Sequence, residues 1–267
     1  MKRIYVYSML ALLFTVYTAD ATLIAWDDFE SYVAGNDLNG GSGGDGWTGS
    51  WTGGAGDVTV ESAIIPAQSL SMQVSDVGDT SNLIRRNFPS QTGTIYAGFQ
   101  VRPSSFEDDD FIQLYFSSGG NQDSALSGGI RNVGGNPFFA RAGGIANNTD
   151  SSVSAIDDQT YQVVLRLART GASHASNYDR VDLFVDQLAE GIPNASTTGN
   201  SNTPSLDTFT IRTHFFEAGD FVGIDHLRIA TTYDEALAPV IPEPSPWALL
   251  GLGLILLRGL RFRMTRA

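Results

Sequence analysis

The sequence predicts an all-β protein, folded as an antiparallel two-sheet sandwich. Apolar residues occupy every second position in several segments, most clearly Ile95–Val101, Tyr161–Leu167 and Val181–Val185. A period of two buries one face of a strand and leaves the other toward solvent, as in antiparallel sheets. Clusters of glycine, asparagine, aspartate and serine separate these segments, and no segment carries a sustained helical stripe. The expected strands are 23–29, 58–62, 69–74, 81–88, 94–101, 112–116, 128–132, 137–142, 161–167, 181–185, 206–215 and 221–231.

The first 21 residues have the three parts of a secretory signal peptide. Lys2 and Arg3 are basic, Met9–Val16 is mostly apolar, and Ala19–Ala21 puts small residues at the two positions that signal peptidase reads. We therefore expect signal peptidase to cleave before Thr22 and the protein to be exported.

The exported body is expected to be one domain, residues 22–240, with a glycine-rich loop near its start. Residues 35–56 contain ten glycines. The spacing Gly41-x-Gly43-x-x-Gly46 has the residues of a dinucleotide-binding fingerprint. However, no apolar helix follows it and no strand–helix–strand unit surrounds it. We discard that match.

Trp47 and Trp51 in this loop have two interpretations. Tryptophan rings can stack on sugar rings, and a glycine-rich loop could present them for glycan contact at the edge of a sheet. Alternatively, both indoles cap the hydrophobic core beneath the loop. We favour the core, because the two residues are four positions apart with Gly49 between them.

Carboxylates are numerous in the body, but none has the spacing of a known catalytic pair. Glu107–Asp110 is an acidic run that we expect to form a solvated turn. Its adjacent carboxylates Asp108, Asp109 and Asp110 could bind a hard cation such as calcium, which is the one cofactor that the sequence suggests. The three histidines, His174, His214 and His226, lack the close spacing of a metal motif, although the last two fall in strands that we expect to be neighbours.

The C-terminal 27 residues form a separate unit, 241–267. Pro242, Glu243, Pro244 and two further prolines nearby end the folded domain in an extended segment. A mostly apolar stretch, 247–262, follows and is expected to span the membrane as a short helix. Basic residues resist translocation and would hold the end of the chain in the cytoplasm. These membrane-stop arginines are Arg258, Arg261, Arg263 and Arg266.

This tail resembles the PEP-CTERM sorting signal of exported proteins from Gram-negative bacteria. The resemblance covers residues 241–267 and includes Pro242-Glu243-Pro244, the glycine- and leucine-rich membrane segment and the basic end, in that order. It implies that an exosortase processes the chain, with Pro242–Pro244 as the recognition site. It also implies transient anchoring in the inner membrane, followed by release to the cell-envelope surface or to the extracellular matrix of a biofilm.

The body resembles the jelly-roll fold of concanavalin A-like lectins and glucanases. Four segments carry this likeness: Asp27–Tyr32, Gly46–Trp51, Asp179–Asp186 and Ile224–Thr232. Hydrolytic members of that group carry Glu-x-Asp-x-x-Glu on one strand, which does not occur here. We therefore expect carbohydrate binding and no enzyme activity.

Composition narrows the partners further. The chain has 267 residues, no cysteine and a net charge of -13, and Lys2 is its only lysine. Nucleic acid is excluded as a partner because the charge has the wrong sign, and disulfides and thiol chemistry are excluded by the absence of cysteine. The expected function is a surface or matrix protein that binds extracellular polysaccharide. The alternatives are a structural or adhesive protein without a ligand, and a polysaccharide hydrolase with an unrecognised carboxylate pair.

Overall fold

The computed structural model describes residues 22–66, 68–75, 82–107, 109–120, 126–131, 133–144, 147–171 and 176–237. The expected signal peptide (1–21) lies outside these residues. So does the C-terminal unit, with Pro242, Glu243, Pro244, the apolar stretch 247–262 and the arginines Arg258, Arg261, Arg263 and Arg266. Within the described part of the chain, no helix has the length and apolar character needed to cross a membrane.

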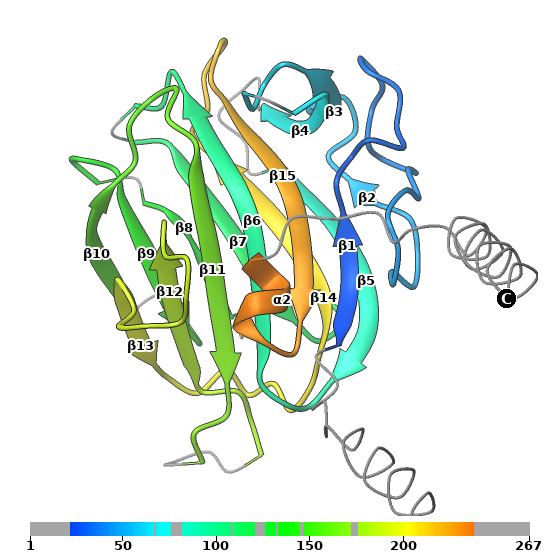
Figure 1. Cartoon of the computed structure of the whole chain (residues 1–267). Coiled ribbons are helices and arrows are strands. Elements are labelled where there is room, and N and C mark those ends of the chain that lie inside the picture. Colours follow the sequence, from blue (N-terminus) through cyan, green and yellow to red (C-terminus); the bar gives the residue numbers. More distant parts are fainter. Residues whose placement is uncertain are drawn as a thin grey trace, which may run out of the picture.

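Two antiparallel sheets face one another, as predicted, and Figure 1 shows the first of them in front. The first sheet runs in the order β13 (Ala195–Thr198), β12 (Arg180–Val185), β11 (Tyr161–Ala168), β6 (Ile95–Ser104), β15 (Phe221–Ala230), β4 (Leu70–Ser75) and β3 (Val58–Ser62), with β1 (Leu23–Asp27) also paired to β15. The second runs β10 (Asn148–Ser154), β9 (Pro137–Ala142), β8 (Leu126–Ile130), β7 (Phe111–Ser117), β14 (Leu206–His214), β5 (Asn82–Gln91) and β2 (Thr52–Gly53).

All twelve expected strands overlap strands of the structure, and three further strands were not expected. The additional strands are β2, β10 and β13, and each lies at an edge of its sheet. β13 reads Ala-Ser-Thr-Thr and carries no run of alternating apolar residues. An edge strand pairs on one side only and contributes little to the core, so it needs no apolar alternation.

The hydrophobic core lies between the two sheets and is formed by the inward-facing apolar residues of the alternating strands. In β7 the inward residues are Ile112, Leu114 and Phe116, and in β14 they include Phe209, whose ring centroid is 5.2 Å from that of Phe116. The outward residues of β7 are buried as well, so the outer face of the second sheet is shielded from solvent at this strand.

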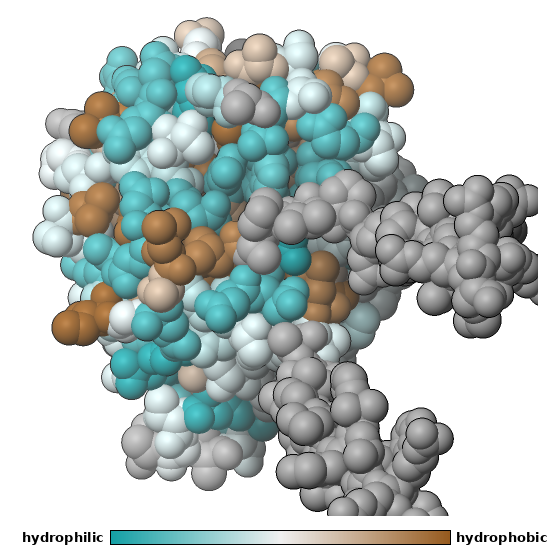
Figure 2. All heavy atoms as spheres, viewed as in Figure 1, coloured by the Kyte–Doolittle hydropathy of each residue, from teal (hydrophilic) through white to brown (hydrophobic). Residues whose placement is uncertain are grey.

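A short helix, α2 (Tyr233–Leu237), packs on the outer face of the first sheet. Gly98 in β6 allows this close approach, because a Cβ atom there would lie 2.0 Å from the carbonyl oxygen of Ala236. Figure 2 shows that this face is largely hydrophilic, with apolar residues gathered beside α2 and the loop that joins β12 to β13. Leu188 and Ile192 in that loop are 88% and 89% exposed.

Candidate functional site

A row of polar side chains crosses the outer face of the second sheet in register. The pairing places Arg141 opposite Ser127, Ser127 opposite Tyr115, Tyr115 opposite Thr210, Thr210 opposite Arg85, and Arg85 opposite Thr52. The row therefore spans six strands, a width of about 24 Å at the usual strand spacing. Its middle is buried, whereas Arg85 and Thr52 at the β5 end are exposed.

A pocket of about 360 Å³ opens at this exposed end. We call it the β5 pocket, and its lining residues are Gly49, Ser50, Thr52, Arg85, Arg86, Asn87, Gly119 and Thr208. The lining is polar throughout and offers hydroxyls, an amide and a guanidinium, which are the groups that hydrogen-bond sugar hydroxyls and carboxylates. None of the described lining residues is an acid.

Arg85 brings a positive charge that no described carboxylate neutralises. Its side chain is exposed and forms no ion pair within the part of the chain that the structure describes. Thr208 donates to the side-chain oxygen of Asn87 at 3.1 Å, which orients that amide at the pocket wall. A guanidinium presents several donors in a planar fork that matches a carboxylate or sulfate group.

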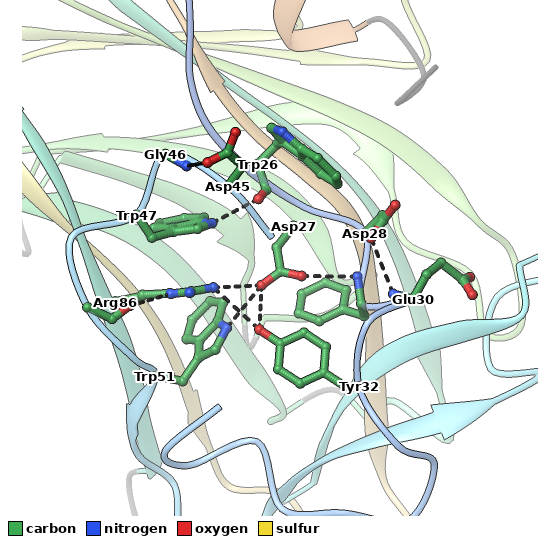
Figure 3. A network of polar contacts seen from close by, with 12 residues as sticks. Trp26, Asp27, Asp28, Glu30, Tyr32, Asp45, Gly46, Trp47, Trp51 and Arg86 are labelled. Carbon is green, nitrogen blue, oxygen red and sulfur yellow. Dashed lines mark hydrogen bonds and ion pairs between the residues drawn. The ribbon is translucent and has the colours of Figure 1, made fainter. Parts of the chain in front are cut away.

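The neighbouring Arg86 has a structural role, which Figure 3 shows. Its Nη1 lies 2.7 Å from Oδ2 of Asp27, and both side chains are almost fully buried. The same carboxylate oxygen accepts hydrogen bonds from the Tyr32 hydroxyl at 2.7 Å and from Trp51 Nε1 at 3.3 Å. Arg86 Nε also donates to the carbonyl oxygen of Gly49 at 2.8 Å, so this ion pair fixes the loop that forms the pocket wall.

Burial raises the pKa of Asp27 above its usual value. The hydrogen bonds from Tyr32 and from the backbone of Phe29, together with the charge of Arg86, act in the opposite direction. The carboxylate is thus held in a site where removal of any partner would leave a buried charge poorly compensated.

Trp47 and Trp51 belong to the scaffold of the pocket and not to its lining. Trp51 is 0% exposed within the core, so the glycan contact considered for it does not hold, because a fully buried indole offers no face to a sugar. Trp47 is partly buried against the core, donates from Nε1 to the Trp26 carbonyl at 2.9 Å and lies 4.9 Å beneath the Arg86 guanidinium. Both indoles therefore support the glycine-rich loop from beneath.

The far end of the polar row carries more positive charge. Arg141 lies over the rings of Phe111 and Phe139, and Arg212 lies over Phe111. Burial lowers the pKa of Arg141, and the nearby charges of Arg131 and Arg212 lower it further. Arg141 and Arg212 thus place two guanidinium groups on this outer face.

A second pocket, of about 580 Å³, lies on the outer face of the first sheet beside α2. His226 lines it and has its Nδ1 3.4 Å from Oδ1 of the buried Asp225. Asp225 raises the pKa of His226 through its hydrogen bond, while burial opposes that effect. Asp234 is the one carboxylate among the described lining residues.

The expected proximity of His214 and His226 is wrong. β14 belongs to the second sheet and β15 to the first, so strands that follow one another in sequence lie in different layers. His174 lies outside the described residues.

The acidic run lies in the loop between β6 and β7. Asp109 and Asp110 are described, and Asp108 lies outside the described residues. The structure places this loop against the loop between β14 and β15, whose acids Glu217 and Asp220 we did not connect with it from the sequence. Neither loop contributes to the β5 pocket.

No protein-family model matches the chain, and no match was found among curated proteins. Among solved structures, the chain is similar to SCLam, a non-specific endo-β-1,3(4)-glucanase from family GH16, at 12% identity and a TM-score of 0.51, covering 79% of this chain and 91% of that one. It is also similar to a botulinum neurotoxin type C structure, at 9% identity and a TM-score of 0.50, covering 79% of this chain and 48% of that one. The lectin UEA-II in complex with galactose matches at 9% identity and a TM-score of 0.47, covering 68% of this chain and 92% of that one. The fold is thus an antiparallel two-sheet jelly roll like that of the glucanase, and at these identities the likeness extends to the fold alone.

Proposed function

We propose that this protein is an exported surface or matrix protein whose jelly roll binds an extracellular polysaccharide in the β5 pocket. The observation that carries the proposal is the pocket itself, an open hollow lined by Arg85, Asn87 and Thr208, with no acid among its described lining residues. Polar groups that converge in a concave site are what a sugar ligand requires. The fold, which lectins and glucanases share, agrees with this function.

The chemistry of the pocket favours a polysaccharide with acidic groups. The body as a whole holds 27 acids and ten arginines, and this charge would repel an anionic polymer at long range. Arg85 at the pocket and Arg141 on the same face offer such a polymer positive charge at short range. A carboxylate or sulfate on the sugar would pair with the Arg85 guanidinium by a charge-assisted hydrogen bond.

Binding is better supported than hydrolysis. Glycoside hydrolysis needs two carboxyl groups on either side of the scissile bond. The described lining of the β5 pocket contains no acid, and that of the first-sheet pocket contains Asp234 as its single carboxylate.

The route to the surface is part of the proposal. Signal peptidase would remove residues 1–21, and an exosortase would recognise Pro242–Pro244 while the stretch 247–262 anchors the chain in the inner membrane. Mass spectrometry of the mature protein tests this route. A mature C-terminus at Ala267, in a strain that carries the exosortase, would contradict it.

A titration with paired polysaccharides tests the ligand. The full-length protein, solubilised in detergent, is titrated by calorimetry with a uronic-acid polysaccharide and with a neutral glucan, each with calcium and with chelator. We expect the acidic polymer to bind more tightly. Arg85→Gln should weaken its binding about tenfold or more, because a hydrogen bond to a charged group is worth about 1.5–3 kcal/mol.

Arg180→Gln is the control for an arginine outside the pocket, because Arg180 lies in β12 of the first sheet, where it pairs with Asp182. It should leave the affinity unchanged. The proposal fails if no polysaccharide binds at millimolar sugar, or if both variants reduce binding equally.

A further inference from the structure

The two loops that carry the chain between the sheets at β6–β7 and β14–β15 have the same sequence pattern. The first reads Phe106-Glu107-Asp108-Asp109-Asp110-Phe111 and the second Phe216-Glu217-Ala218-Gly219-Asp220-Phe221, so both follow Phe-Glu-x-x-Asp-Phe. The first loop leads from the first sheet to the second, and the other leads back.

The loops also share their conformation. In each, the aspartate carboxylate accepts a hydrogen bond from the glutamate backbone N–H, at 2.6 Å in both cases. In each, the residue before the first phenylalanine has a positive φ, 56° at Ser105 and 68° at Phe215. The rings of Phe106 and Phe216 pack edge to face with centroids 5.6 Å apart, which brings the two loops together.

This packing gathers carboxylates from both loops. Oxygen atoms of Asp110, Glu217 and Asp220 lie within 4.8 Å of one another, and so do those of Glu107, Asp109 and Glu217. Glu217 is common to both sets and therefore lies where they meet.

One of these carboxylates is buried without a partner for one of its oxygens. Asp110 is 0% exposed, and its Oδ1 has no hydrogen-bond partner among the residues that the structure describes. A buried carboxylate beside other carboxylates is unfavourable unless it binds a cation or a proton.

We propose that the two loops together bind one calcium ion, through the carboxylates of Asp110, Glu217 and Asp220. Oxygens that share one calcium ion lie up to about 5 Å apart, because each is about 2.3–2.6 Å from the metal. The three carboxylates lie within 4.8 Å of one another and so inside that limit. Magnesium loses its water ligands reluctantly and so is less suited to a site made of three protein carboxylates. Water would complete the coordination on the exposed side of Glu217.

The bound ion would link the two sheets. Asp110 immediately precedes β7 of the second sheet, and Asp220 immediately precedes β15 of the first. Calcium would neutralise acids that otherwise repel one another across the two loops and would hold the crossings together. This site is separate from the β5 pocket, so its test is independent of polysaccharide binding.

The state without calcium should show that repulsion. Burial raises the pKa of Asp110 to about 7, and the charges of Asp220, Glu217 and Asp109 contribute. A proton and a calcium ion would therefore compete for the same carboxylate near neutral pH.

Calorimetric titration of the full-length protein with calcium chloride at pH 7.5, after chelator treatment, tests the proposal. We expect one site per chain, a rise in melting temperature on binding and weaker binding to magnesium. Glu217→Gln is an exposed substitution that should not disturb folding, and it should weaken calcium binding at least tenfold. Asp110→Asn should abolish both the binding heat and the calcium-induced rise in melting temperature.

Glu61→Gln in β3 is the control for a carboxylate outside the cluster, and it should bind calcium as the wild type does. The proposal is overturned if calcium gives no heat at millimolar concentration. It is equally overturned if Glu217→Gln and Glu61→Gln bind calcium with the same affinity as the wild type.

Discussion

Replacing Arg86 by methionine should be among the most destabilising single changes in this protein. The substitution keeps a long apolar stem but removes the guanidinium that pairs with Asp27. Because Arg86 is 3% exposed and Asp27 is 0% exposed, solvent cannot replace the lost charge. The carboxylate would keep only the hydrogen bonds from Tyr32, Trp51 and the backbone of Phe29.

The expected loss is about 3–5 kcal/mol, the range for removing one partner of a buried ion pair. A domain of ordinary stability has about 5–15 kcal/mol in total, so the variant should fold but with a much smaller margin. The loss should also depend on pH. Without Arg86 the pKa of Asp27 rises further above its unfolded value, so the variant loses stability as pH increases and its deficit is larger at pH 8 than at pH 5.

Urea denaturation at both pH values measures this loss. Asp158→Asn is the matched control, because it removes the ion pair with Arg102 in which Asp158 is 63% exposed. Its cost should stay below about 1 kcal/mol. The double variant Asp27→Asn, Arg86→Met should recover part of the loss, because it no longer buries a charge. A cost for Arg86→Met no larger than that of Asp158→Asn would refute the reasoning.

Three further changes have expected outcomes. Without calcium, the unfolding free energy should fall as pH rises from about 4 to about 7, by at most about 1.4 kcal/mol per pH unit. The reason is that Asp110 in the folded protein holds its proton up to a pKa of about 7. Urea titrations should show this slope, and Asp110→Asn should flatten it. Gly98→Ala should displace α2 at a cost of about 1–3 kcal/mol, since the new methyl group would meet the Ala236 carbonyl; faster amide exchange in α2 than in the wild type would show it. Trp51→Ala should cost about 3–5 kcal/mol in urea denaturation, because it empties a fully buried site.

The fold was predictable to the extent that strands have an apolar face. Strands that contribute to the core, such as β6 and β11, alternate clearly and were found with nearly their observed bounds. β10 reads Asn-Thr-Asp-Ser-Ser-Val-Ser and has no such alternation. Its backbone pairs with β9 alone, so its position depends on the neighbouring strand and not on its own side chains.

The sites were less predictable, because they depend on contacts between distant segments. The tryptophans marked the correct loop, but their burial depends on Asp27 and Arg86, which are distant in sequence. Arg85 is a single exposed arginine, and nothing in the neighbouring residues identifies it as part of a pocket. The acidic loops did leave a local signal, since Phe-Glu-x-x-Asp-Phe occurs twice, and comparison of the two copies would have indicated Glu217 and Asp220.

The distribution of arginines connects the net charge with the proposed function. The body has ten arginines against 27 acids, and six of the ten form ion pairs with described acids. Arg85 and Arg141 form no ion pair with a described acid, and both lie on the outer face of the second sheet. If arginines without an ion pair served solubility alone, they would be expected on any face of the domain. Their concentration on the face that holds the β5 pocket favours an acidic ligand there over a purely structural role for the domain.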